Sequence, residues 1–156
     1  MSEPYKDKQI MDHWKIVPTK KVVGHLIALT GLRLTNRVTW IIHPRTRACP
    51  KYCIIELTVT DETDIQPGTK VSSVVYLGFA EITVGGLVVT GQTVTIQGVP
   101  IGKVVGFSEI HYPNHLNIIV SANEAFASDY LLSIENASNA NLRYKLDDQV
   151  VFEAFS

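Results

Sequence analysis

The feature that most constrains this fold is a stretch from residue 85 to residue 120, which glycines divide into short segments. Residues 92–97 alternate between polar and apolar side chains, which is typical of a strand. We expect a turn at Gly98-Val99-Pro100 and a second, antiparallel strand at residues 101–107. Glycine supplies the positive φ angles and close backbone approaches that tight turns require. No helical period is sustained here, so the stretch predicts short strands joined by turns.

The rest of the chain continues this pattern. Residues 52–60 end in a period-two alternation that places Ile55, Leu57 and Val59 on one buried face. We expect further strands at residues 27–30, 32–34, 38–43, 70–77, 79–84, 87–89, 116–120, 130–135 and 149–155. Many short strands without a long helix are typical of an all-β barrel. We therefore predict one compact β-barrel of short antiparallel strands over residues 1–156, with residues 1–20 as a polar arm.

Composition narrows the class of protein. The chain has 156 residues, of which 46% are hydrophobic, enough to bury one core. No apolar run is long enough to cross a bilayer, and the first residues lack the apolar segment of a secretory signal. We expect a cytoplasmic protein without membrane contact, in which Cys49 and Cys53 are reduced thiols acting as small buried hydrophobes.

The net charge of -1 conceals an asymmetry along the chain. Residues 1–60 carry ten Lys and Arg against four Asp and Glu, whereas residues 61–156 carry four against eleven. This asymmetry predicts either two solvated faces or self-association of complementary surfaces, and we expect a homo-oligomer, most simply a dimer. The basic residues form no stripe with interleaved aromatics, so nucleic-acid binding is not expected.

The best candidate site follows the central run, where Glu109 and His111 are two positions apart and would share one side of a strand. Pro113 then bends the chain and returns His115 towards His111, and Asn117 follows. These four residues are our candidate ligand-binding site, with Glu109, His111 and His115 as candidate metal ligands. The same groups also suit acid–base chemistry, or a loop that only caps the barrel.

Three other histidines offer weaker candidates. His43 ends a predicted strand before Pro44-Arg45, and a histidine beside arginines suits phosphoryl chemistry, although polar residues often end strands. His25 lies among apolar residues and is expected in the core or an interface, whereas His13 is expected in solvent. No P-loop, dinucleotide fingerprint or nucleophile elbow is present, which argues against a nucleotide enzyme.

The central run also carries a family resemblance. Residues 91–99 (GQTVTIQGV), 101–104 (IGKV), Ser108-Glu109 leading to Tyr112-Pro113, and 117–119 (NII) resemble the glucitol/sorbitol-specific IIA protein of the bacterial phosphotransferase system. Residues 150–153 (VVFE) are similar to its closing strand. The resemblance implies a small, commonly dimeric β-barrel that carries a phosphoryl group on a histidine. That histidine belongs on a strand upstream, where residues 74–81 (VVYLGFAE) contain none.

These observations rank the expected functions. We expect first a non-catalytic small-molecule-binding or regulatory barrel, with a polar ligand near Glu109, His111 and His115. A histidine phosphocarrier that uses His43, or a histidine of the 109–115 loop, is one alternative. A metal-dependent enzyme that uses the 109–115 loop is another.

Overall fold

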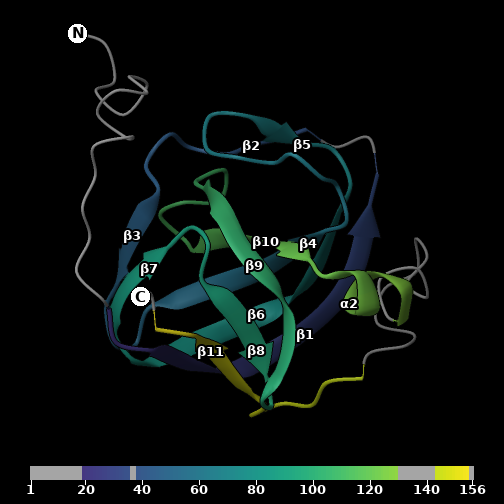
Figure 1. Cartoon of the computed structure of the whole chain (residues 1–156). Helices are drawn as coiled ribbons and strands as arrows, with labels where there is room; N and C mark the ends of the chain where they lie inside the picture. Colours follow the sequence, from purple (N-terminus) through teal and green to yellow (C-terminus); the bar gives the residue numbers. More distant parts are fainter. Residues whose placement is uncertain (1–18, 36–37, 130–142, 155–156) are drawn as a thin grey trace, which may run out of the picture.

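A computed structural model describes residues 19–35, 38–129 and 143–154 of the chain. Seven strands close into a barrel in the order β1-β11-β8-β9-β10-β4-β6, and β6 pairs back with β1 (Figure 1). The single compact all-β barrel expected from the sequence is confirmed. The elements are β1 (Val22–Leu34), β2 (Thr39–Trp40), β3 (Thr46–Cys49), β4 (Ile54–Thr60), β5 (Lys70–Val71), β6 (Val74–Val84), β7 (Gly86–Val89), β8 (Thr93–Ile96), β9 (Val99–Ser108), β10 (Leu116–Ala122), α2 (Glu124–Asp129) and β11 (Gln149–Phe152).

The barrel interior is filled by one apolar cluster. Alternate residues of each strand point inward, as the period-two pattern of β4 predicted, because successive side chains of a strand face opposite sides. Phe107 and Phe152 are its largest fully buried side chains. Burial of this apolar surface at about 25 cal/mol per Å² is the main force that holds the barrel closed.

One strand pair departs from the expected antiparallel arrangement. β10 pairs in parallel with β4, and the register places Asn117 opposite Glu56. A parallel pair requires a long crossover, which here contains β5 to β9. Two polar residues 61 positions apart in the sequence therefore become neighbours on one face of the sheet.

Several strand boundaries also differ from the sequence prediction. Residues 27–34 belong to one continuous strand, β1, which bends through register shifts and through Gly31 at a φ of 58°. The turn predicted at residues 98–100 lies earlier, where Gln97 and Gly98 both have positive φ as in a type I′ turn. The predicted strand at 130–135 and most of the polar arm lie outside the described residues.

The predicted strand at 38–43 is reduced to β2, which pairs with β5 above the barrel (Figure 1). The Ile41 amide still donates to the Thr69 carbonyl, next to β5, but the Ile42 amide donates to the Phe107 carbonyl of β9, so the pairing of β2 with β5 stops there. β3 pairs with β7 beside the barrel (Figure 1). Among the described helices, none has the length and apolarity needed to cross a membrane.

Candidate functional site

Strand β4 is buried on both of its faces. Ile55, Leu57 and Val59 point into the barrel, whereas Glu56 and Thr58 point to the opposite side and are also buried, Glu56 with only 6% of its surface exposed. A carboxylate removed from water is costly unless polar groups compensate it. The outer side of β4 therefore needs polar partners.

Those partners come from the 109–115 loop, which joins β9 to β10. The Tyr112 amide donates to the Glu109 carbonyl at 3.0 Å, and the His115 amide donates to the His111 carbonyl at 3.3 Å, which makes two successive turns. The Tyr112-Pro113 peptide bond is cis. The two imidazoles lie side by side, with ring centroids 4.9 Å apart.

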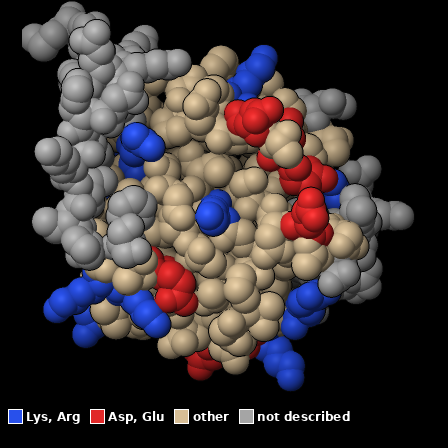
Figure 2. Space-filling model, viewed as in Figure 1, with Lys and Arg blue, Asp and Glu red and all other residues tan. Residues whose placement is uncertain are grey.

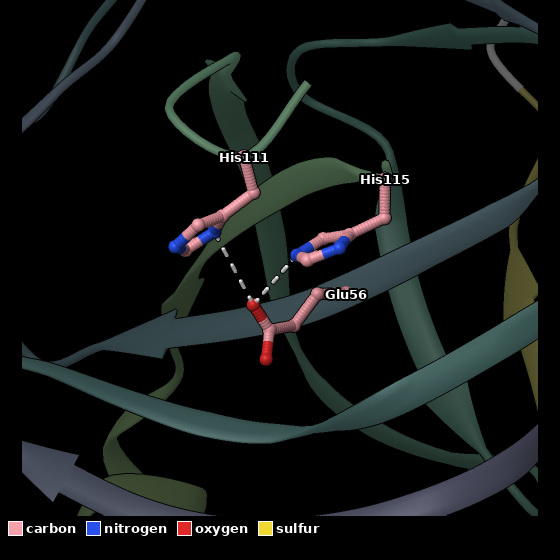
Figure 3. A group of neighbouring side chains, drawn as sticks. All are labelled: Glu56, His111 and His115. Carbon is pink, nitrogen blue, oxygen red and sulfur yellow. Dashed lines mark ion pairs between the residues drawn. The ribbon is translucent and has the colours of Figure 1, made fainter. Parts of the chain in front are cut away.

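The two imidazoles converge on the Glu56 carboxylate (Figure 3). His115 Nε2 lies 3.3 Å from Glu56 Oε1, and His111 Nδ1 lies 3.9 Å from the same oxygen. One ligand atom from each residue lies within 4.8 Å of the others. The His115 side chain is 10% exposed and that of His111 is 33% exposed, so the cluster opens to solvent on the His111 side.

Asn117 fixes the orientation of this cluster. Its amide nitrogen donates to Glu56 Oε1 at 2.8 Å and to Thr58 Oγ1 at 3.0 Å. The amide oxygen therefore faces His111 Nδ1 at 3.1 Å, and that ring nitrogen acts as the donor. The neutral His111 ring then keeps its lone pair on Nε2.

Buried polar atoms without hydrogen-bond partners border the same cluster. His115 Nε2 is one of them, because its approach to Glu56 lacks hydrogen-bond geometry. The Tyr76 hydroxyl is another, on a ring 6.4 Å from that of His111. Ser108 Oγ is a third, on the residue opposite Asn117 in the β9–β10 register. Such atoms are rare in native proteins, and a group of them marks a place where a polar partner would be favourable.

Of the four residues predicted to form the site, the structure brings three together and leaves one apart. His111, His115 and Asn117 come together as expected. Glu109 does not join them: its carboxylate accepts a hydrogen bond from Arg47 at 2.9 Å and is 40% exposed. The expectation that Glu109 and His111 share a strand face is wrong because residues 109–115 form turns.

Glu56 takes the place predicted for Glu109, and the sequence analysis missed it. The alternation of β4 placed Glu56 opposite the buried face, where a charged residue usually meets solvent. No local signal distinguishes it, since only the parallel register with β10 brings it beneath the two histidines.

The remaining histidines lie elsewhere. His43 follows β2, and its ring packs against Gly68, where a Cβ would lie 2.7 Å from Nδ1. His25 does not lie in the core, one of the two places expected for it, and the interface stays a prediction: its Nε2 lies 3.8 Å from Glu81 and 3.9 Å from Asp147, at a partly exposed position of β1. The residue at position 13 lies outside the described residues.

Comparison with known proteins gives one match. No curated protein and no solved structure matches the chain. A family model described as a family of unknown function, DUF6917, matches residues 16–141, which include β1 to β10 and every residue of the cluster described above. The chain therefore belongs to the DUF6917 family, whose function is unknown.

Proposed function

We propose that this protein binds a divalent transition-metal ion through Glu56, His111 and His115, and that the ion in turn binds a small polar ligand. The observation that carries the proposal is a buried carboxylate faced by a buried imidazole nitrogen that has no hydrogen-bond partner. A cation between these atoms would compensate the carboxylate and occupy the nitrogen lone pair together.

The donor set fits such an ion chemically. Imidazole nitrogen and carboxylate oxygen bind zinc at about 2.0–2.2 Å, so that neighbouring donor atoms lie roughly 3.0–3.5 Å apart. The histidine-to-carboxylate separations are 3.3 and 3.9 Å, and the three ligand atoms lie within 4.8 Å of one another, so the side chains must contract by roughly 1 Å to hold one ion. Three protein ligands also leave coordination positions open, as in sites where the ion binds water or another molecule.

A metal-free arrangement competes with this proposal. If His115 is protonated, its ion pair with Glu56 compensates the carboxylate without a metal. Binding an ion at His111 Nδ1 also requires the ring proton to move to Nε2 and the bond to Asn117 to be given up. Purified protein should therefore contain the metal ion if the proposal is right, and no metal if the His115–Glu56 ion pair is the native arrangement.

Elemental analysis of gently purified protein tests the proposal, followed by reloading of chelator-treated protein with Zn²⁺ or Co²⁺. We expect about one ion per chain in the parent protein and none in Glu56→Gln or His115→Ala, since three ligands are the usual minimum for a stable site. Glu109→Gln is the matched control, because it neutralises the carboxylate that the sequence analysis favoured and leaves Glu56 in place. Metal-free parent protein that also fails to take up added ions would contradict the proposal.

The phosphocarrier alternative stays a prediction. It requires one histidine to gain a phosphoryl group when the protein is incubated with phosphoenolpyruvate and the general carrier proteins. The setting of His43 against Gly68 adds no observation in its favour.

A further inference from the structure

A second group of reactive side chains lies on the other side of His115. A pocket of about 310 Å³ opens between the end of β3 and the 109–115 loop, and Arg47, Cys49, Cys53, Tyr112, Asn114 and His115 are among its lining residues. Cys49 and Cys53 are the two cysteines of the sequence, so both of its thiols line one pocket.

The two thiols differ in access. Cys49 ends β3, where it pairs with Gly86, and only 1% of its surface is exposed. Cys53 follows a tight turn in which its amide donates to the Pro50 carbonyl at 3.1 Å, and it is half-buried at the pocket wall. The turn returns the chain on itself, so that both thiols line the same pocket. Cys53 is therefore the thiol that a molecule in the pocket meets first.

The two thiols also differ in acidity. Interaction between the two thiols lowers the pKa of Cys53 and raises that of Cys49. Burial raises the pKa of both, but the net pKa of Cys53 stays below the usual value for a thiol, whereas that of Cys49 lies well above it. The positive charge of Arg47 favours the thiolate form at both. A thiolate is the nucleophile in thiol chemistry, so Cys53 attacks more readily.

From this arrangement we propose that Cys53 and Cys49 form a thiol–disulfide exchange site for low-molecular-weight disulfides, with Cys53 as the attacking residue and Cys49 as the resolving residue. The Cys53 thiolate attacks one sulfur of the small disulfide, whose sulfur–sulfur bond breaks, and the leaving thiolate takes up a proton. A mixed disulfide between Cys53 and the small molecule results.

The second step forms the disulfide bond between Cys49 and Cys53. Cys49 loses its proton to solvent, and its thiolate attacks Cys53 Sγ of the mixed disulfide, which breaks that bond and releases a second small thiolate that is then protonated. In total the two cysteines are oxidised to one disulfide, and the small disulfide is reduced to two thiols. The turn between the cysteines keeps Cys49 beside the mixed disulfide in the pocket.

Oxidised glutathione is a suitable probe, with intact mass and peptide mapping of acid-quenched samples as the measurement. We expect the full-length protein to become lighter by two hydrogens as the internal disulfide forms. In a Cys49→Ser variant we expect a stable adduct of one glutathionyl group on Cys53. In a Cys53→Ser variant we expect Cys49 to react at least roughly tenfold more slowly than Cys53 does in Cys49→Ser.

Three results would overturn the proposal: equal rates in the two variants, a persistent mixed disulfide in the parent protein, or no reaction of the folded parent while the denatured chain reacts. Peptide mapping of the parent at early times keeps the test valid if a variant fails to fold, because it shows which cysteine first carries glutathione. The chain contains only these two cysteines, so each adduct has one assignment within each variant.

Discussion

At the scale of single residues, Asn117 decides whether Glu56 can stay buried. Its amide satisfies the carboxylate, the Thr58 hydroxyl and His111 Nδ1 at once. Asn117 was predicted to bind a ligand, and in the structure it also bonds three other members of the cluster.

We expect Asn117→Ala to lower the free energy of unfolding by about 1–3 kcal/mol, because it leaves a buried carboxylate without its hydrogen-bond donor. Urea unfolding of metal-free protein measures the effect. Asn114→Ala is the control: Asn114 bonds His115 at 2.7 Å but is exposed, so its loss should change stability by no more than about 0.5 kcal/mol. Equal effects of the two substitutions would show that the Asn117 network does not stabilise the fold.

At the scale of elements, the site depends on how closely β9 and β10 approach each other. β10 carries Asn117 and pairs with β9 on one side and β4 on the other. At Gly102 a Cβ would collide with the backbone carbonyl of Ser121 on β10, so this pairing requires glycine. The sequence analysis expected glycine for turns and crowded backbone, and Gly102 is a case of crowding within a strand.

We therefore expect Gly102→Ala to destabilise the barrel by about 1–3 kcal/mol, since the strands must separate to admit the methyl group. Gly86→Ala is a suitable comparison, because the nearest atom to its Cβ is Cγ2 of Val22 at 3.2 Å, which needs to shift by only a few tenths of an ångström. Thermal and urea unfolding of both variants measure the difference. Parent-like stability of Gly102→Ala would mean that β9 and β10 are not held this closely.

At the scale of the whole molecule, the charge asymmetry of the sequence is partly compensated within one chain. Among the residues that the structure describes, three Lys or Arg side chains of the first 60 positions pair with acidic residues beyond them: Lys21 with Glu153 at 3.3 Å, Arg33 with Asp61 at 3.5 Å and Arg47 with Glu109 at 2.9 Å. Figure 2 accordingly shows basic and acidic side chains interspersed on the face it draws. The homodimer stays a prediction, which light scattering of the purified protein tests.

Metal binding should also appear as a property of the whole fold, because an ion that binds only the folded state stabilises it. At a free Zn²⁺ concentration of 100 times Kd the gain is about 2.7 kcal/mol, or a rise in Tm of roughly 5–10 °C for a domain of this size. We expect this shift in the parent protein and in Glu109→Gln, but not in Glu56→Gln. An equal shift in all three proteins would place the ion elsewhere.

The sequence by itself determined the fold class and half of the site. Glycine positions and period-two alternation depend on backbone geometry and burial, which act over a few residues, so they predicted short strands, one barrel and the loop that holds His111 and His115. Only the tertiary structure decided which carboxylate meets those histidines and that Cys49 and Cys53 share a pocket wall with His115. The reason is the parallel pairing of β4 with β10: its register depends on how the whole barrel closes, and no local pattern encodes it.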